Sequence, residues 1–404
     1  MDIADCIGDG KHLRVASTLC KLELERCLEW GGVRAAVAWG CGRRMVLLGP
    51  QDGDMEVFLR EAASGNVPWV RGCRLGAGLE VEGYGLRGIL ARGEGVVVKL
   101  LAFAVEDNPE YVVLSYLSRV EPGLVPQPVC SMSVDGVQVG IATRAIEGEP
   151  LAVEFISSAF RDVEPPSLED LALGVARLHR ALYGCVEDWC RPRPVSREDV
   201  EEWSERLRWR AKLLRRIATP DDLGLVEALD SMDELASLMA RSYRGIIEAP
   251  AIRIHGDLHL YQVYRSPRGL VFTDFEGEPY REPARRDVLE PPARDIATLI
   301  RSIDYASALA LMERGMDAGE AALEASRGMR GWREAVSRRL LKAYLKALGE
   351  DPLAEGDWES GLAFWVAERA SYELVYDIIE GTGLHHIPLN AILRIRDSWP
   401  RVAW

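Results

Sequence analysis

The spacing of the hydrophobic positions changes along this chain, from short runs in the first third to helical periods later. The runs VRAAVAW (33–39) and RMVLLG (44–49) predict strands, because they are short, apolar and flanked by glycine. The apolar residues of Thr18–Trp30 recur at helical spacing, so this segment predicts a helix. Residues 79–103 alternate β-prone runs with glycines, which is typical of hairpins.

A second group of elements follows the hairpin-like region. Asn108-Pro109 opens a helical pattern that continues through Val120, because proline is favoured in the first helical turn. Residues 137–146 predict another strand, and Glu147-Gly148-Glu149-Pro150 ends it. Together, the strand-like runs at 79–103 and 137–146 and the helical pattern between them predict a β-rich lobe that contains one helix.

The chain after Pro150 is predicted to be mainly helical. SLEDLALGVARLHRALYG (167–184) begins with a serine cap and acidic residues in its first turn. Further helices are predicted at 197–217, 222–245, 295–313, 333–349 and 358–380. Two short strands, 251–254 and 270–275, interrupt them. These patterns predict an α+β protein in which a small N-terminal unit and a β-rich lobe precede a larger helical lobe with one short hairpin.

Composition and charge restrict the classes of partner and the environment. The 404-residue chain is 48% hydrophobic, enough for a sizeable core divided among two or three units. Its formal net charge of -14 argues against nucleic acid as a partner and suits neutral or cationic small molecules. No apolar run is long enough to span a bilayer, and the N-terminus lacks a signal-peptide pattern, so we expect no membrane contact and a cytoplasmic location.

The eight cysteines show no metal-ligand spacing and no Cys-x-x-Cys pair. We therefore expect scattered buried thiols rather than a zinc site or a disulfide framework. Lysine is used sparingly, at six positions, whereas arginine is common. A lysine inside an apolar strand, Lys99, is consequently a candidate functional residue.

Three polar side chains near the two short strands suggest phosphoryl transfer. Asp257 follows the first strand in HGDLHLYQ (255–262), Gln262 lies five residues later, and Asp274 follows the second strand. Phosphoryl transfer requires a carboxylate to accept the proton of the attacking hydroxyl. It also requires oxygen ligands for Mg²⁺, which an amide and a second carboxylate supply. A polar turn between two core strands is the alternative interpretation.

Upstream, Gly83, Gly85 and Gly88 match a Gly-x-Gly-x-x-Gly pattern between two predicted strands. This position argues against a dinucleotide fingerprint and favours a hairpin folded over phosphates, although an ordinary tight turn explains the glycines equally well. Lys99 follows in VVVKLL (96–101), where a kinase places the ammonium that binds the α- and β-phosphates. A lysine that extends from an edge strand into solvent is the alternative for Lys99.

Several stretches together resemble the maltokinases, a family of the aminoglycoside-phosphotransferase branch of the protein-kinase-like fold. The stretches are HGDLHLYQ (255–262), DFEGEP (274–279), PARDIATLIRSIDYA (292–306), ARLHRAL (176–182), ERASYELVYD (368–377) and IPL (387–389). The resemblance is clear from about residue 170 onward. It implies a bilobal protein-kinase-like fold with an N-terminal cap subdomain (1–76), a nucleotide-binding N-lobe (77–148) and a helical C-lobe (149–404).

The resemblance also implies roles for single residues. Asp257 is the expected catalytic base, and Gln262 and Asp274 are the expected Mg²⁺ ligands, joined by Glu276. ATP is the implied phosphate donor, bound at Lys99 and at the three glycines. The hinge after strand 137–146, with Arg144 and Ile146, is expected to hold the adenine. A sugar hydroxyl is the implied acceptor, most closely the anomeric hydroxyl of maltose.

One late helical segment has a composition that fits a sugar site. Trp365, Glu368, Tyr372 and Tyr376 fall on one helical face, and sugars bind to flat apolar rings beside hydrogen-bond acceptors. Aromatic residues at this spacing are also common in helix cores. His259 is expected either to contact the acceptor or to brace the catalytic loop.

We also expect Asp295 to cap the helix that follows it. The expected carboxylate partner of Lys99 is less clear. Its place in the helical pattern is taken by Val112, and Glu110, which lies roughly 200° around the helix, substitutes poorly unless the register differs. Val112 therefore leaves open a catalytically inactive, nucleotide-binding scaffold. A kinase for glucosamine or an aminoglycoside is a further alternative, because the acid-rich stretches 161–170 and 197–203 would suit a cationic acceptor if they border the cleft.

Overall fold

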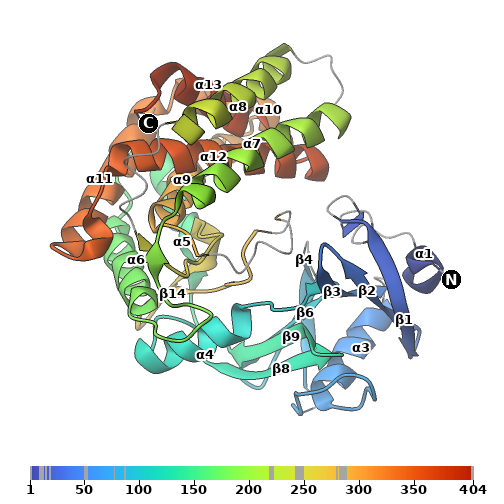
Figure 1. Ribbon diagram of the computed structural model, residues 1–404. Helices are drawn as coiled ribbons and strands as arrows, with labels where there is room; N and C mark the ends of the chain where they lie inside the picture. The colour runs from blue at the N-terminus through green and yellow to red at the C-terminus, as the bar shows by residue number, and fades with distance from the viewer. Residues whose placement is uncertain are drawn as a thin grey trace. The chain divides into compact units, whose positions relative to one another are not determined.

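The computed structural model describes residues 2–8, 13, 16–17, 20–49, 53–76, 78–85, 88–217, 223–241, 250–278, 281 and 289–401. The chain forms two compact units (Figure 1). Unit 1 comprises the described residues within 1–147 and 267–288, and unit 2 comprises those within 148–266 and 289–404. The fold is mixed α and β, with the β-rich part toward the N-terminus and the helical part toward the C-terminus, as predicted.

A four-stranded antiparallel sheet of order β1-β2-β3-β7 forms the first layer of unit 1. Its strands are β1 (Leu22–Trp30), β2 (Val33–Gly40), β3 (Arg43–Gly49) and β7 (Phe103–Val105). The predicted strands 33–39 and 44–49 are confirmed. Gly31 and Gly32 both have positive φ, +56° and +86°, and connect β1 to β2 in the two-residue turn that glycine pairs favour.

The predicted helix Thr18–Trp30 is wrong over residues 22–30, which form β1. A register irregularity between Leu24 and Arg26 interrupts the alternation, because one extra residue in the strand shifts the side-chain phase. The partly buried apolar residues after the irregularity, Cys27 and Leu28, therefore follow Leu24 at a spacing of three and four, which resembles a helical period.

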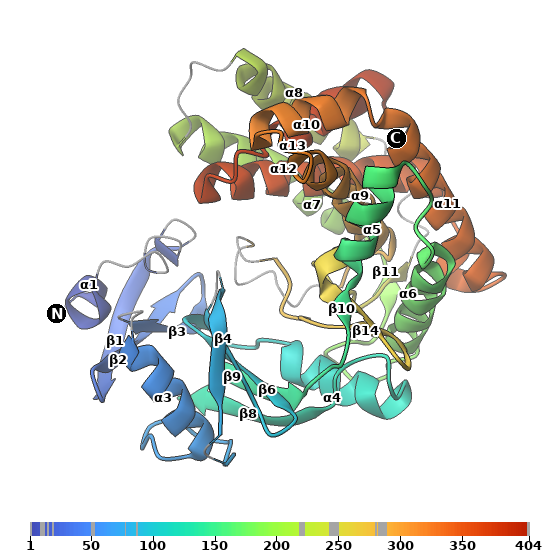
Figure 2. The ribbon, with the colours of Figure 1, turned by 180° about the vertical axis from the view of Figure 1, so that it is seen from behind.

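A five-stranded antiparallel sheet of order β4-β5-β6-β9-β8 completes the β-structure of unit 1. Its strands are β4 (Glu80–Gly85), β5 (Gly88–Gly93), β6 (Val96–Leu101), β8 (Pro128–Val134) and β9 (Val137–Arg144). The helices of this unit are α1 (Ile3–Ile7), α3 (Gly53–Ser64) and α4 (Glu110–Val120). Figure 2 shows α3 next to the strands, and Phe58 of α3 shares one apolar core with residues of both sheets. The short strand β14 (Gly269–Phe272) also belongs to this unit.

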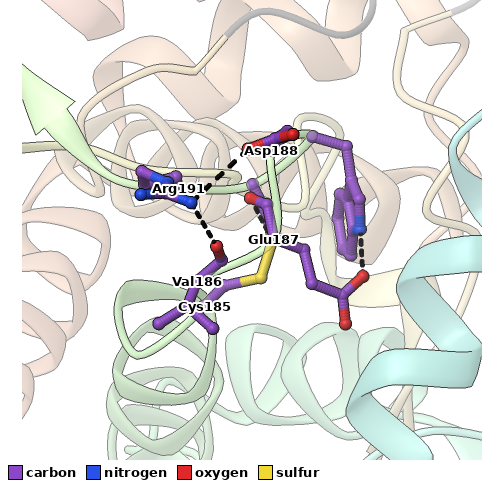
Figure 3. The surroundings of a disulfide bond; sticks show 7 residues. Cys185, Val186, Glu187, Asp188 and Arg191 are labelled. Carbon is purple, nitrogen blue, oxygen red and sulfur yellow. Dashed lines mark hydrogen bonds and ion pairs between the residues drawn. A yellow bond between two sulfur atoms is a disulfide. The ribbon is translucent and has the colours of Figure 1, made fainter.

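All eight cysteines form disulfides, so the prediction of free thiols is wrong. The pairs are Cys6–Cys27, Cys20–Cys41, Cys73–Cys130 and Cys185–Cys190. Their Cα atoms lie 5.4–5.9 Å apart, within the usual disulfide range. Three pairs join residues that are 21 or 57 positions apart, so local spacing did not indicate them. The fourth, in unit 2, closes a short loop in which Arg191 donates to the Val186 carbonyl at 2.9 Å (Figure 3).

Unit 2 consists mainly of nine helices within the described residues. They are α5 (Leu151–Arg161), α6 (Leu168–Tyr183), α7 (Arg197–Ile217), α8 (Leu223–Arg241), α9 (Ala293–Met312), α10 (Ala318–Arg327), α11 (Arg330–Leu348), α12 (Trp358–Glu380) and α13 (His386–Ser398). In Figure 1, α7, α8, α12 and α13 pack beside one another. The predicted boundaries of α7 and α12 match the structure, whereas α3, α5, α10 and α13 were not predicted.

The short strands of unit 2 are β10 (Glu149–Pro150), β11 (Arg193–Pro194), β12 (Pro250–Ala251) and β13 (Val263–Ser266). The predicted strand 251–254 is therefore shorter than expected, since only a single bridge from Ile252 to Glu290 follows β12. Two 3₁₀ helices, η2 (Leu260–Gln262) and η4 (Pro352–Ala354), also lie in the described part of this unit. Among the described residues, no helix is both long and apolar enough to cross a membrane.

Candidate active site

Lys99 is the centre of a charged cluster in unit 1. Strand β6 presents its half-buried side chain among three carboxylates. The Lys99 Nζ atom lies 2.5 Å from Asp274 Oδ1, 2.6 Å from Glu276 Oε1 and 3.4 Å from Glu110 Oε2. Burial lowers the pKa of Lys99, but the three carboxylates outweigh it and hold the pKa above its ordinary value. The ammonium is consequently a fixed positive charge.

Glu110 supplies the carboxylate partner of Lys99. The sequence pattern had placed this partner at position 112, which is a valine. The expectation that Glu110 substitutes poorly is wrong, because Glu110 is the first residue of α4 and is buried toward Lys99. Val112, by contrast, is exposed. Burial, together with the negative charges of Asp274 and Glu276, raises the pKa of Glu110 to about 7 despite the lowering effect of Lys99.

Asp274 and Glu276 follow β14 in a tight turn. Asp274 has φ +65°, a conformation that costs energy for a residue with a side chain and that is often found at functional sites. Ligand oxygens of Glu110, Asp274 and Glu276 lie within 4.8 Å of one another. Carboxylate oxygens are the donors that Mg²⁺ prefers, so this group has the chemistry of a magnesium site. The strand before the turn ends at Phe272, three residues earlier than predicted.

The glycine pattern lies on the β4–β5 hairpin, with Gly85 paired to Gly88. A Cβ atom on Gly88 would lie 1.8 Å from the Leu100 carbonyl oxygen, so close strand approach alone requires this glycine. A Cβ atom on Gly83 would meet nothing within 4 Å. Residues 86–87, between the paired glycines, lie outside the described residues. A contact of Gly83, Gly85 or Gly88 with phosphate stays a prediction.

The predicted adenine hinge follows β9. Arg144, the last residue of this strand, is exposed, and its backbone N–H donates to the Gln127 carbonyl at 2.8 Å. Ile146 is half-buried in the segment after it. The boundary of unit 1 falls at Glu147, directly after this segment. Binding of adenine by Arg144 and Ile146 stays a prediction.

The loop of Asp257 belongs to unit 2 and is held by a buried aspartate. Asp295 accepts hydrogen bonds from the backbone N–H of His255 at 2.8 Å and of Gly256 at 3.0 Å. His179 Nε2 lies 3.1 Å from the same carboxylate, and Tyr344 Oη lies 2.7 Å from His179 Nδ1. Burial raises the pKa of Asp295, but these hydrogen bonds and the nearby histidines outweigh it, so the pKa is lowered.

The prediction that Asp295 caps the following helix is therefore wrong. Helix α9 begins at Ala293, so Asp295 lies inside its first turn, and its carboxylate binds the loop of Asp257 instead. The neighbouring Arg294 reinforces this attachment, because its Nη1 donates to the Gly256 carbonyl at 2.9 Å. The start of α9 thus binds both the backbone N–H and the carbonyl of Gly256, the residue before Asp257.

Asp257 is partly buried and forms an ion pair with α12. Its Oδ1 accepts from Nη1 of Arg369 at 2.7 Å, and Nε of Arg369 also donates to Glu373 at 3.1 Å. The half-buried side chains of His259 and Gln262 follow in the same loop, with His259 Nε2 and Gln262 Nε2 separated by 3.4 Å. The sequence thus places these three side chains in one loop of unit 2, whereas Lys99, Asp274 and Glu276 gather in unit 1.

The four residues predicted to bind sugar lie along α12 with different surroundings. Trp365 is fully buried against Trp203, and their ring centroids lie 4.8 Å apart. Glu368 is fully buried, and its carboxylate oxygens lie 2.9 Å from Arg210 and 3.5 Å from Arg294. Both side chains are therefore occupied by contacts inside unit 2. Their role at an acceptor stays a prediction.

The two tyrosines lie further along α12. The ring of Tyr372 is buried, with the guanidinium groups of Arg369 and Arg210 at 4.8 Å and 5.5 Å from its centroid. Tyr376 is half-buried, with its ring centroid 6.5 Å from that of Tyr372. Of the four predicted residues, Tyr376 is therefore the least buried, which suits a contact with a small molecule. This assignment also stays a prediction.

Sequence reasoning missed two residues that contact the loop of Asp257, Arg294 and Arg369. It also missed that Asp295 binds the backbone of this loop. A signal was present for Arg369, since it and Glu368 are the two charged residues of the mainly apolar stretch FWVAERASY (364–372). A charge at such a position requires a partner of opposite sign. The identity of that partner, 112 positions earlier in the chain, depends on the tertiary fold.

The fold of this chain is similar to that of a kinase of known structure. The solved structure of a glucosamine kinase in complex with glucosamine, ADP and inorganic phosphate superposes with a TM-score of 0.66 at 18% identity. The superposition covers 95% of this chain and 96% of that one. The predicted protein-kinase-like fold is therefore confirmed. No family model matches the sequence.

Two curated relatives carry the name glucosamine kinase. The protein from Mycolicibacterium smegmatis is 27% identical over 170 residues, which are 41% of each chain. The protein from Streptacidiphilus jiangxiensis is 27% identical over 228 residues, which are 55% of this chain and 48% of that one. The matched part of this chain thus spans less than half the length of either relative. The maltokinase part of the prediction stays a prediction.

Proposed function

We propose that this protein is an ATP- and Mg²⁺-dependent kinase that phosphorylates a hydroxyl group of a small sugar, with an amino sugar such as glucosamine as its acceptor. The contact of Lys99 with Asp274, Glu276 and Glu110 is the observation that carries this proposal. Phosphoryl transfer in kinases uses such a lysine, paired with a helix glutamate, beside the metal-binding aspartate. The position of Glu110 also removes the reason for the inactive-scaffold alternative.

The chemistry can be divided among the residues of the two units. In this proposal Lys99 binds the α- and β-phosphates, and Glu110 holds its ammonium in place. Asp274 and Glu276, with the amide oxygen of Gln262, would hold Mg²⁺, which neutralises charge on the phosphate oxygens when bound. Asp257 orients the acceptor hydroxyl and accepts its proton as the hydroxyl oxygen bonds to the γ-phosphorus of ATP and the bond from that phosphorus to the ADP oxygen breaks.

The choice of acceptor rests on the relatives. Both curated relatives are named glucosamine kinase, and one neighbouring structure contains glucosamine. Maltose is the second candidate, favoured by the resemblance of HGDLHLYQ and ERASYELVYD to maltokinases. In either case we assign Tyr376 and His259 to the acceptor. The protein's net charge of -14 suits a cationic amino sugar better than a neutral disaccharide.

The domain roles and the location form part of the proposal. We assign residues 1–76 to a cap, 77–148 to nucleotide binding and 149–404 to the catalytic loop and acceptor. A cytoplasmic location has to accommodate four disulfides, which are rare in the cytosol outside hyperthermophiles. Alkylation of protein taken directly from its native cells, followed by mass spectrometry, tests whether these cysteines are oxidised there.

The first test is ADP release by the purified protein with ATP, Mg²⁺ and a panel of glucosamine, maltose, trehalose, glucose and kanamycin. We expect turnover with glucosamine and loss of turnover when Mg²⁺ is chelated. Turnover with maltose alone would keep the kinase and change the acceptor. No ADP release with any sugar, together with retained ATP binding, would contradict the proposal and favour the catalytically inactive, nucleotide-binding scaffold.

Lys99→Met provides a matched test of the nucleotide assignment, with the exposed Lys21→Met as its control. We expect Lys99→Met to lose measurable turnover and to bind ATP more weakly. An unchanged rate in a folded Lys99→Met protein would contradict the assignment of Lys99 to the phosphates.

A further inference from the structure

The ion pair between Arg369 and Asp257 joins the proposed catalytic base to the long helix α12. Arg369 Nη1 donates to Asp257 Oδ1 at 2.7 Å, and both side chains are largely shielded from solvent. The guanidinium also donates through Nε to Glu373 at 3.1 Å and lies 4.8 Å from the ring centroid of Tyr372. These three contacts fix the orientation of the planar group, so Arg369 forms the ion pair from a preset position.

A chain of buried ion pairs continues from Arg369 into unit 2. Glu373 Oε2 accepts from Nε of Arg301 on α9 at 2.8 Å. Arg301 also pairs with Asp304, which in turn pairs with Arg333 on α11 at 2.7 Å. Removal of one partner of a buried ion pair leaves the other charge without compensation and destabilises the protein. The position of Arg369 is therefore supported directly by Glu373 of α12 and, through Glu373, by Arg301 of α9.

We propose that Arg369 is a positioning residue for Asp257, an inference that rests on the proposed function. A base must be ionised before it accepts a proton, and a permanent cation at hydrogen-bond distance favours the ionised carboxylate. The same hydrogen bond restrains rotation of the carboxylate, which keeps its proton-accepting oxygen in one direction. Arg369 thus prepares Asp257 for proton transfer, and it contributes nothing to ATP binding.

The test compares Arg369→Met and Arg369→Lys with Arg333→Met. Arg333 belongs to the same buried network and pairs with Asp304, so its variant loses network stability while the Asp257 pair stays intact. We expect Arg369→Met to lower kcat about 10²-fold while the KM for ATP stays within about twofold, the scale for a misplaced reacting group. Arg369→Lys should restore part of kcat, and added guanidinium ion should partly rescue Arg369→Met.

Three outcomes overturn the inference while the wild type remains active. They are an unchanged kcat in a folded Arg369→Met protein, an equal loss of kcat in Arg333→Met, and a loss confined to the KM for ATP. An inactive wild type would instead contradict the proposed function. In that case, the melting temperatures of Arg369→Met, Asp257→Asn and the double variant decide the pairing. Non-additive shifts support it, and additive shifts overturn it.

Discussion

The two units of this protein use charged residues in opposite ways. In the described part of unit 1, the buried charged side chains are Glu110, Glu276, Glu278 and Arg281, so three of the four belong to α4 or to the segment around Asp274. The rest of that unit is held by apolar sheet faces and three disulfides. Buried charge in unit 1 is thus confined mainly to the proposed nucleotide site.

Unit 2 instead distributes buried charge through its core. One cluster joins Arg206, Arg210 and Arg294 with Glu290 and Glu368, and it reaches the loop of Asp257 through Arg294. The network of Arg369 reaches the same loop from another side. Under the proposed function, unit 1 therefore separates stability from chemistry, whereas unit 2 uses the same ionic contacts for both.

The largest effect on this comparison is expected from Glu368→Gln in the ionic cluster of unit 2. Loss of one charge leaves buried arginines without compensation, so we expect the free energy of unfolding to fall by about 3–5 kcal/mol. Chemical denaturation measures this change, and the exposed Glu359→Gln on the same helix is its control. A loss below about 1 kcal/mol would mean that the cluster adds little to the stability of unit 2.

A comparable effect is expected in unit 1 from the double variant Cys73→Ser and Cys130→Ser. This disulfide closes a loop of 57 residues, so chain entropy predicts a loss of about 4 kcal/mol. The matched control removes Cys185 and Cys190, which are five residues apart, for which the same relation predicts about 2 kcal/mol. Differential scanning calorimetry distinguishes the two. Equal losses would contradict a dominant role of loop entropy in unit 1.

Asp257→Ala is expected to change turnover directly, by a free energy smaller than the two losses of stability above. Turnover should fall at least about 10²-fold, because a positioned base contributes on this scale. ATP affinity should stay within about twofold, since the nucleotide residues lie in unit 1. The ADP-release assay and equilibrium binding of ATP measure the two quantities, with exposed Asp188→Ala as control. A rate near that of the wild type would disprove the base assignment.

The smallest effect, counted per pH unit, is expected in the pH dependence of the free energy of unfolding of unit 2. Burial raises the pKa of Glu368, but Arg210, Arg294 and Arg206 outweigh it and lower the pKa to about 2, below the ordinary value of 4.5. Its contribution to stability is therefore complete above about pH 4.5 and is lost as the pH falls toward 2. We expect a slope of up to about 1.4 kcal/mol per pH unit in that window. Glu368→Gln should remove it, and an unchanged slope in the variant would assign the effect to other carboxylates.

Local patterns predicted the helical part well, because unit 2 relies on long amphipathic helices. The predicted spans 197–217 and 358–380 coincide with α7 and α12. The prediction was wrong at β1, where an irregular register imitates a helical period, and it missed shorter helices such as α3. The cysteine pairs were also missed, because strand pairing brings together residues distant along the chain.

The sequence by itself determined the motif that we propose for phosphoryl transfer, since Asp257, Gln262, Asp274 and Lys99 stand in recognisable local patterns. It also determined the β-rich and helical order of the chain, because side-chain periodicity is a local property. Only the tertiary structure decided which residues support the motif. Glu110 reaches Lys99 from the start of α4, and Arg369 reaches Asp257 from α12. The physical reason is that an ion pair depends on a distance of a few ångströms in space, which no spacing along the chain specifies.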